Sequence, residues 1–259
     1  MTGPTPTKPG RGAWTATGGL LPPKPGQVGR GYYYRPPYEG EDVVGVAGLR
    51  PTCTYNEAVV TEAVRAIQRL LIDYAQLHEL DVPRIQVTGR FGDQTGLIAA
   101  RVQKHLGLVP DCIVGPKTVW ALIAPMIEQA AAKYGLPVWL LRGIHLVESQ
   151  GDLGAVGAET PADTGPFQCN RAAHLQVSIR QAVDPRWSAL WTAAALRKFC
   201  DQWVGRTSVD LVTLAIASHN SPKSAVEWAR GNKPPRSPGR SFNIEDYVEK
   251  VRVAGLVSS

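Results

Sequence analysis

An internal repeat is the feature that most constrains how this chain can fold. The segments "VTGRFGDQTGLIAARVQ" and "PDCIVGPKTVWALI" align so that Gly92 matches Gly115 and Thr95 matches Thr118. Each unit has a tight glycine turn, then a threonine at or near a helix start, then apolar residues at helical spacing. A motif that occurs twice in register predicts two equivalent turn-and-helix units in one small domain.

Helical patterns flank the repeat on both sides. The segment "TYNEAVVTEAVRAIQRLLIDYAQLH" has Glu57 in its first turn and an apolar face made of Val60, Val64, Ile67 and Leu71. In "APMIEQAAAKYGLP" a further helix is expected to begin at Pro125, because proline is tolerated at the first helical position. Residues 53–125 are therefore expected to form a small three-helix domain, followed by a second, α-rich domain.

The repeat resembles the peptidoglycan-binding domain of the small three-helix type, whose signature is a D-G-x-x-G-x-x-T turn before a helix that carries a glutamine. The resemblance covers about residues 57–124 and rests on Gly89, Gly92, Thr95, Gln103, Asp111, Gly115 and Thr118. Thr88 stands where the signature has aspartate, and Cys112 where it often has glycine. The resemblance implies binding to bacterial peptidoglycan, whereas the glycines and threonines alone imply only turns and helix caps.

The N-terminal residues 1–52 have a different composition. Proline and glycine crowd this stretch, and "LLPPKPGQVGRGYYYRPPYEGE" has neither helical nor strand periodicity. It cannot bury enough apolar surface to fold alone, so we expect an irregular Pro/Gly-rich arm that is disordered or bound to a partner. The tyrosines favour an anchor on a partner protein, since such side chains gain most from packing: Tyr32, Tyr33, Tyr34 and Tyr38.

Charge and hydropathy exclude several classes of protein. The net charge of +6 favours contact with a polyanion, but no dense Lys/Arg block and no nucleic-acid motif is present, so nucleic acid is not an expected partner. The start lacks the basic and apolar regions of a signal peptide. No apolar run reaches membrane-spanning length, so membrane insertion is not expected either.

The cysteines do not predict a metal site. Cys53, Cys112, Cys169 and Cys200 form no C-x-x-C pair, so a zinc site of the usual spacing is not expected. Reduced, buried thiols are the favoured interpretation, with a disulfide between Cys169 and Cys200 as the alternative. No cofactor motif and no cluster of metal ligands occurs in the sequence, so neither is expected.

One carboxylate stands in an apolar helical run. In "PVWLLRGIHLVESQG" the spacing of Leu140, Ile144 and Val147 defines a buried face, and Glu148 lies at the edge of that face near the helix end. Partial burial and the negative end of the helix dipole both raise the pKa of a carboxyl group placed there. A raised pKa suits a general acid, although the spacing alone fits an ordinary boundary glutamate equally well.

Four segments resemble, in order, the four motifs of the soluble lytic transglycosylase family, which has a lysozyme-like fold. They are "GIHLVESQGDLGAVG", "DTGPFQCN", "LAIASHN" and "EDYVEKV", and the resemblance covers about residues 126–253. It implies that Glu148 is catalytic and that the substrate is bound by Ser149, Gly165, Gln168, His219, Asn220 and Tyr247. The departures from the family pattern are His219 in place of tyrosine, Ser221 and Pro222 in place of A-G, and Pro166 and Phe167 in place of Leu and Met.

The resemblance implies cleavage of the β-1,4 bond between N-acetylmuramic acid and N-acetylglucosamine. Glu148 would act first as acid and then as base, giving 1,6-anhydro-muramic ends, and the acetamido group of the substrate would replace a second carboxylate. Asp152, Glu159 and Asp163 lie in the glycine-rich loop that follows. One of them could activate water, which would make the protein a hydrolytic muramidase; a non-catalytic wall-binding structural protein is a third interpretation.

Together these patterns predict a mainly α chain in three parts: the arm at residues 1–52, a peptidoglycan-binding domain at 53–125 and a lysozyme-like domain at 126–259. A wall-degrading enzyme without a signal peptide favours a bacteriophage endolysin or a virion-borne lytic protein. It would act on the bacterial cell wall from the virion or from inside the host cell. The expected partners are peptidoglycan and, through residues 1–50, other virion proteins.

Overall fold

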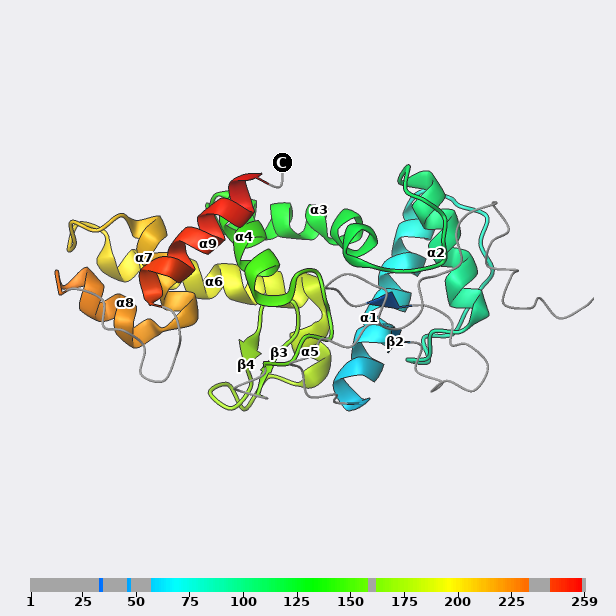
Figure 1. Ribbon diagram of the computed structural model, residues 1–259, viewed down its shortest axis with the longest axis horizontal. Coiled ribbons are helices and arrows are strands. Elements are labelled where there is room, and N and C mark those ends of the chain that lie inside the picture. The colour runs from blue at the N-terminus through cyan, green and yellow to red at the C-terminus, as the bar shows by residue number, and fades with distance from the viewer. Residues whose placement is uncertain (1–32, 35–45, 48–56, 158–161, 233–242, 258–259) are drawn as a thin grey trace, which may run out of the picture. The chain divides into compact units, whose positions relative to one another are not determined.

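A computed structural model describes residues 33–34, 46–47, 57–157, 162–232 and 243–257, and these are mainly α-helical (Figure 1). The predicted fold class is thereby confirmed. The chain divides into two compact units, residues Met1–Leu122 and Ile123–Ser259. Across the ranges that the structure describes, no helix combines the length and the apolar character needed to cross a membrane.

The first unit contains helix α1 (Glu57–Leu77), helix α2 (Asp93–His105) and the beginning of helix α3 (Pro116–Tyr134). The apolar face predicted for α1 is confirmed, since its four residues are all buried: Val60, Val64, Ile67 and Leu71. Helix α1 packs against α2, whose Ile98 is also buried. Burial of these aliphatic side chains is the main source of stability in a unit of this size.

Helix α3 differs from the expectation that a new helix begins at Pro125. Pro125 lies inside α3, which continues to Tyr134. Proline lacks the N–H group that would bond the carbonyl four residues earlier, so the helix loses one hydrogen bond there. Pro125 is exposed, and solvent can therefore satisfy that carbonyl, which explains why the helix does not end.

Within the arm, the structure describes only two short strands. Strand β1 (Tyr33–Tyr34) pairs antiparallel with β2 (Val46–Ala47), and Tyr33 lies opposite Ala47. This one strand pair departs from the expectation that the arm is irregular. The rest of residues 1–52, including Tyr32 and Tyr38, lies outside the described residues.

The second unit consists of helices and one small hairpin. Strand β3 (Asp163–Thr164) pairs antiparallel with β4 (Cys169–Asn170), and Val156 adds an isolated bridge to Thr164. Figure 1 shows the hairpin and α5 together on one side of α6. The helices are α4 (Val138–Ser149), α5 (Ile179–Val183), α6 (Pro185–Trp203), α7 (Leu211–Asn220), α8 (Pro222–Ala229) and α9 (Ile244–Val257).

Local sequence explains where the helices α6 and α8 begin. Asp184 caps α6 by accepting hydrogen bonds from the backbone N–H groups of Arg186 and Trp187, each at 3.0 Å. Ser221 caps α8 by accepting from Ser224 N, and Pro222 occupies the first turn, where its missing N–H is not needed. The Ser221 and Pro222 pair, a departure from the family pattern, is therefore a helix start that directly follows α7.

Two glycines allow α4 and α9 to pack backbone against backbone. A Cβ atom on Gly143 would lie 2.1 Å from the carbonyl oxygen of Val251, and one on Gly255 would lie 2.2 Å from that of Trp139. The first contact pairs Gly143 with Val251 and the second pairs Trp139 with Gly255, so a step forward along α4 is a step back along α9. The two helices therefore cross in antiparallel directions. Only glycine fits at such a distance. The crossing fixes the register in which the last turn of α4 meets the first turn of α9.

Candidate functional site

The two turns of the repeat are held by two buried glutamines in the same way. The Gln68 amide accepts a hydrogen bond from Gly89 N at 3.0 Å and donates to the Arg90 carbonyl and to Thr95 Oγ1. The Gln103 amide repeats this pattern: it accepts from Cys112 N at 3.2 Å and donates to the Ile113 carbonyl and to Thr118 Oγ1. The sequence predicted the turns and Gln103, but it missed Gln68, which lies 21 residues before its turn.

The two departures from the signature keep the geometry of the turns. Cys112 has a φ of +63° and Gly89, at the matching place, a φ of +81°. This left-handed region favours glycine, which explains why the signature prefers glycine where Cys112 stands. Thr88 Oγ1 accepts a hydrogen bond from Arg90 N at 3.2 Å, as Asp111 Oδ1 accepts from Ile113 N at 2.9 Å. Threonine therefore performs the structural task of the aspartate.

The residues predicted for wall binding lie within this scaffold. Thr95 and Thr118 are both 3% exposed, and Asp111 accepts a second hydrogen bond from Gln103. Gly92 caps α2, and Gly115 accepts a bond from Val119 N one turn into α3. Such residues shape the turns, so side chains outside the signature must make most of the contacts with any ligand.

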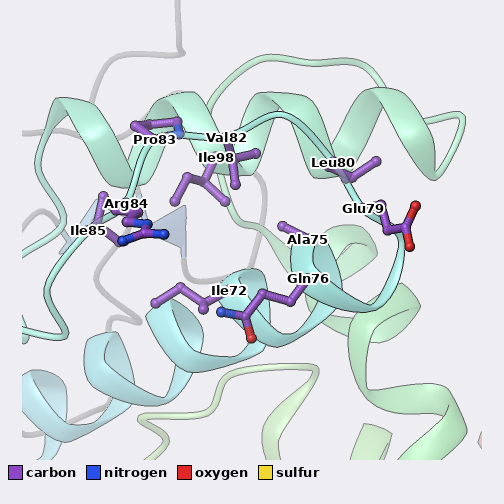
Figure 2. A pocket seen from close by; sticks show the side chains of 10 residues that line it. All are labelled: Ile72, Ala75, Gln76, Glu79, Leu80, Val82, Pro83, Arg84, Ile85 and Ile98. Atoms are coloured by element: carbon purple, nitrogen blue, oxygen red, sulfur yellow. The ribbon is translucent and has the colours of Figure 1, made fainter.

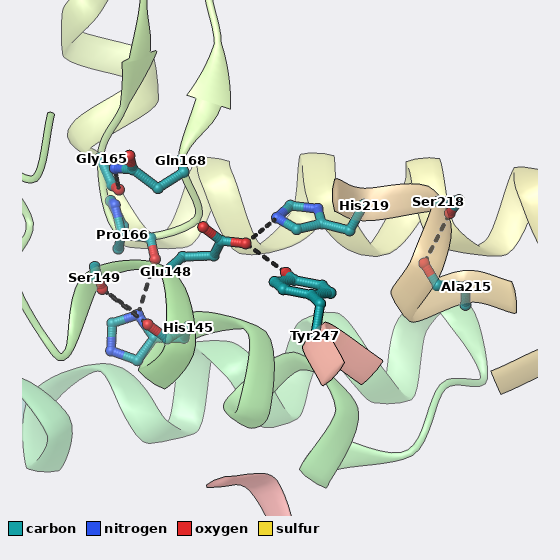
Figure 3. A network of polar contacts seen from close by, with 10 residues as sticks. All are labelled: His145, Glu148, Ser149, Gly165, Pro166, Gln168, Ala215, Ser218, His219 and Tyr247. Atoms are coloured by element: carbon teal, nitrogen blue, oxygen red, sulfur yellow. Dashed lines mark hydrogen bonds and ion pairs between the residues drawn. The ribbon is translucent and has the colours of Figure 1, made fainter. Parts of the chain in front are cut away.

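In the second unit, the carboxylate of Glu148 is a meeting point of three helices (Figure 3). Glu148 lies on the last turn of α4, where Gln150 ends the helix in a left-handed conformation. The hydroxyl of Tyr247, on the first turn of α9, donates a hydrogen bond to Glu148 Oε1. His219 Nε2, at the end of α7, lies 3.7 Å from the same oxygen. The side chain of Glu148 is 19% exposed, so part of it remains accessible to solvent.

The α4–α9 crossing explains how residues 99 positions apart come into contact. Gly255 of α9 lies opposite Trp139 of α4. Four residues later in α4, Gly143 lies opposite Val251, which is four residues earlier in α9. One more step of four residues in each helix reaches Val147 and Tyr247, beside Glu148. The close packing of the two glycines therefore positions the Tyr247 hydroxyl at the carboxylate.

His219 contacts Glu148 as a neutral ring. Burial lowers the pKa of His219 to about 4, although a hydrogen bond to the Phe167 carbonyl and the charge of Asp163 act in the opposite direction. At neutral pH the imidazole carries no charge, so its contact with Glu148 is not an ion pair there. A neutral imidazole beside a half-buried carboxyl group does not oppose protonation of that group as a cation would.

The loop between β3 and β4 brings Gln168 to the other side of Glu148 (Figure 3). Gly165 has a φ of +85°, and a Cβ atom on it would lie 2.0 Å from the Ala182 carbonyl oxygen, so only glycine lets the loop pack against α5. Gln168 has a φ of +47° and donates its side-chain N–H groups to the carbonyls of Gly165 and Ala155. Gln168 therefore closes the loop on itself with its amide nitrogen.

His145 is a residue of this site that the sequence analysis missed. It is completely buried on α4, and its Nδ1 lies 3.2 Å from the Pro166 carbonyl in the 165–168 loop. A carbonyl only accepts hydrogen bonds, so Nδ1 carries the ring proton. Burial lowers the pKa of His145 to about 4, while the bond to Pro166 raises it. The signal that could have revealed it is its place one turn before Ser149 on the buried face.

Ser149 lies on that buried face and is 0% exposed. Its Oγ donates to the His145 carbonyl at 2.9 Å and accepts from Gly151 N at 3.3 Å. Ser149 thus supports the end of α4 rather than facing the solvent side of Glu148. Asn220 ends α7 next to His219, and its Oδ1 is buried without a hydrogen-bond partner among the described residues.

The acidic residues of the following loop have different environments. Asp152 is 3% exposed, and its Oδ1 accepts a hydrogen bond from Gly154 N at 2.9 Å. Asp163 lies on β3, close enough to His219 for its charge to raise the pKa of that ring. Glu159 lies outside the described residues. The structure therefore groups Glu148, Tyr247, His219 and the Gln168 loop, with Asp163 nearby.

The described cysteines are free and buried, which confirms the expectation of reduced thiols for Cys112, Cys169 and Cys200. The alternative of a Cys169–Cys200 disulfide is wrong, because both thiols are free: Cys169 packs with Val177 and Ala182, whereas the Cys200 thiol donates to the Leu211 carbonyl at 3.5 Å. Cys53 lies outside the described residues. Within the ranges that the structure covers, no group of three or more His, Cys, Asp or Glu side chains could hold a metal ion.

A comparison with known protein families supports the peptidoglycan-binding resemblance of the first unit. Residues 60–122 match the model of the peptidoglycan-binding domain family. This range begins in α1, includes both glutamine-held turns and ends in α3. This match identifies residues 60–122 as a peptidoglycan-binding domain and supports peptidoglycan as a partner. No curated protein matches the chain.

Proposed function

We propose that the second unit cleaves the glycan strands of the peptidoglycan to which the first unit binds, with Glu148 as the catalytic acid. The observation that supports this proposal is the convergence at Glu148 of Tyr247 from α9 and His219 from α7, beside the loop that carries Gln168. These residues come from the four segments that resemble the motifs of soluble lytic transglycosylases. A boundary glutamate without a function would not require partners from two distant helices.

The first step is proton transfer to the glycosidic oxygen, which stays on C4 of N-acetylglucosamine as a hydroxyl group when its bond to C1 of N-acetylmuramic acid breaks. Glu148 Oε1 accepts the hydrogen bond of Tyr247, so the acidic proton is expected on Oε2. Tyr247 fixes the rotamer of the carboxyl group through this hydrogen bond. Positive charge then develops at C1 of N-acetylmuramic acid.

The second step closes a ring on the sugar itself. The acetamido group of N-acetylmuramic acid assists at C1, and Glu148, now a carboxylate, accepts the proton of the C6 hydroxyl. Oxygen O6 forms the bond to C1, which gives a 1,6-anhydro end and returns the proton to Glu148. This route needs one protein carboxylate, in contrast to the two of most glycosidases.

Asn220 is suited to bind the substrate in this scheme. Its buried Oδ1 lacks a partner among the described residues, and an unsatisfied buried acceptor costs about 1–3 kcal/mol. The N–H group of an acetamido substituent would satisfy it. His219, with a neutral ring beside Glu148, would line the same subsite.

A hydrolytic muramidase is the second candidate, and the position of Asp163 favours it. The charge of Asp163 acts on His219, which in turn contacts Glu148. A carboxylate and an imidazole so arranged could remove a proton from a water molecule that attacks C1. Asp152 fits this role less well, because it is buried and bonded to Gly154 N.

The biological setting that fits these features is a bacteriophage endolysin or a virion-borne lytic protein. The support is the pairing of a peptidoglycan-binding domain with the candidate catalytic unit, together with the tyrosine-rich arm, which would bind other virion proteins. Deletion of residues 1–50 should abolish association with virions and leave sacculus cleavage intact. Loss of cleavage in that variant would show instead that the arm belongs to the fold.

Digestion of purified sacculi tests the catalytic proposal. The wild type should clear a sacculus suspension, and Glu148→Gln should reduce the rate by a factor of at least about 100, as expected for removal of a general acid. Glu128→Gln is the matched control, because Glu128 is exposed on α3 in the same unit. Absence of clearing by the wild type would identify the chain as a non-catalytic wall-binding protein, and equal clearing by Glu148→Gln would disprove the role of this residue.

A further inference from the structure

The first unit has a pocket that the peptidoglycan-binding signature does not include. Its volume is about 520 Å³, and it lies between the second half of α1, the extended segment after α1 and helix α2 (Figure 2). Its lining includes Ile72, Ala75, Gln76, Glu79, Arg84 and Ile98. None of them belongs to the two glutamine-held turns.

The floor and the rim of this pocket differ in character. Ala75 and Ile98 are 1% and 0% exposed and form an apolar floor with partly buried aliphatic neighbours such as Ile72. Arg84 and Glu79 are exposed at opposite ends of the pocket (Figure 2). Neither of these two side chains has an ion-pair or hydrogen-bond partner among the residues that the structure describes.

The backbone at Glu79 adds a second observation. Glu79 has a φ of +51°, a left-handed conformation that costs a residue other than glycine about 1 kcal/mol. The turn is closed by a hydrogen bond from Leu80 N to the Ala75 carbonyl at 2.8 Å. This turn holds the Glu79 carboxylate at one end of the pocket, with the Arg84 guanidinium at the other end (Figure 2).

We infer that this pocket binds the stem peptide of peptidoglycan. The inference rests on the peptidoglycan binding of residues 60–122 and not on catalysis by Glu148. A stem peptide carries alanine methyl groups, free carboxylates and the ammonium group of its diamino acid. The methyl groups match the apolar floor, the guanidinium of Arg84 matches a carboxylate, and the carboxylate of Glu79 matches the ammonium group.

Calorimetric titration of the full chain with the synthetic peptide L-Ala-D-Glu-L-Lys-D-Ala-D-Ala tests this inference. The wild type should bind, and Arg84→Ala should weaken binding about tenfold, as expected for loss of one charged hydrogen bond. Gln76→Trp, which places a bulky side chain at the exposed rim, should abolish binding. Arg101→Ala is the matched control, because it removes an exposed arginine of α2 outside the pocket and should leave the affinity unchanged.

Retention on intact sacculi and on peptide-free glycan strands separates this inference from the function on which it rests. Equal retention on both materials, with no competition by the peptide, would overturn the pocket assignment and leave peptidoglycan binding in place. Absence of retention on sacculi would overturn peptidoglycan binding itself. Peptide binding that appears only after deletion of residues 1–50 would show that the arm fills the pocket in the intact chain, which also contradicts the inference.

Discussion

Replacement of Gly143 by alanine tests whether the α4–α9 crossing positions the candidate catalytic residues. The new Cβ atom would lie 2.1 Å from the Val251 carbonyl oxygen, whereas ordinary contact begins at 3.4 Å. A backbone carbonyl cannot rotate away as a side chain can, so the two helices must separate by about 1 Å. Overpacking costs about 1–3 kcal/mol and the gain in helix propensity is about 1 kcal/mol, so the free energy of unfolding should fall by about 0–2 kcal/mol.

The effect on activity should be larger than the effect on stability. A separation of about 1 Å moves the Tyr247 hydroxyl away from Glu148, and a misplacement of this size can lower a catalytic rate about 100-fold. Sacculus clearing measures the rate, and thermal unfolding measures the stability. Gly205→Ala is the control in the same unit: its Cβ atom meets nothing within 4 Å, so apart from about 1 kcal/mol for its positive φ the variant should clear sacculi at the wild-type rate.

A Gly143→Ala protein that clears sacculi at the wild-type rate would refute the positioning argument. Tyr247→Phe separates the two links of that argument, since it removes the hydroxyl and leaves the helices in place. This variant should lose activity about tenfold with little change in the midpoint of thermal unfolding. Full activity would show that the hydrogen bond to Glu148 has no role in the reaction.

Two further predictions concern stability. Gly89→Ala should lower the free energy of unfolding by about 2–4 kcal/mol, because its Cβ atom would lie 2.6 Å from Thr61 Cγ2. Gly107→Ala is the control: Gly107 has a similar positive φ but open space around it, so this variant should cost only about 1 kcal/mol. Equal losses of stability in denaturant titrations of the two variants would contradict the role of the close contact at Gly89. The pKa values of His145 and His219 are lowered from 6.5 to about 4, so the unfolded chain binds protons in this range and the folded chain does not. The midpoint of thermal unfolding should therefore be highest above about pH 6.5 and fall as the pH is lowered towards 4. The variant His78→Gln, which changes an exposed histidine, should show the same dependence of the midpoint on pH. A midpoint that does not change with pH would contradict the burial of His145 and His219 as neutral rings.

Local patterns predicted those parts of the structure that depend on neighbours in sequence. The apolar spacing of α1 and the glycine turns before α2 and α3 follow from residues within one or two turns of each other. The same periodicity placed Glu148 at the edge of a buried face near a helix end, as observed. The start predicted at Pro125 failed because solvent exposure, which local sequence does not encode, allows a proline inside a helix.

Contacts between distant segments could not be derived from spacing. Gln68 and its turn are separated by a helix end and a loop, so nothing local marks this glutamine as a partner of Gly89. The contact of Glu148 with Tyr247 depends on two glycines, Gly143 and Gly255, whose role appears only when α4 and α9 are packed together. Tyr247 entered the candidate site through the order of family motifs and not through any periodicity.

The most direct test of the account follows solvent oxygen during sacculus digestion. The reaction is carried out in water enriched in heavy oxygen, and the released muropeptides are analysed by mass spectrometry for wild type and Glu148→Gln. The account predicts wild-type products that are lighter by one water than their hydrolysed counterparts and contain no heavy oxygen, and almost no products from Glu148→Gln. Heavy oxygen at the muramic acid ends would instead identify a hydrolase, and undiminished release by Glu148→Gln would contradict the central role of this carboxylate.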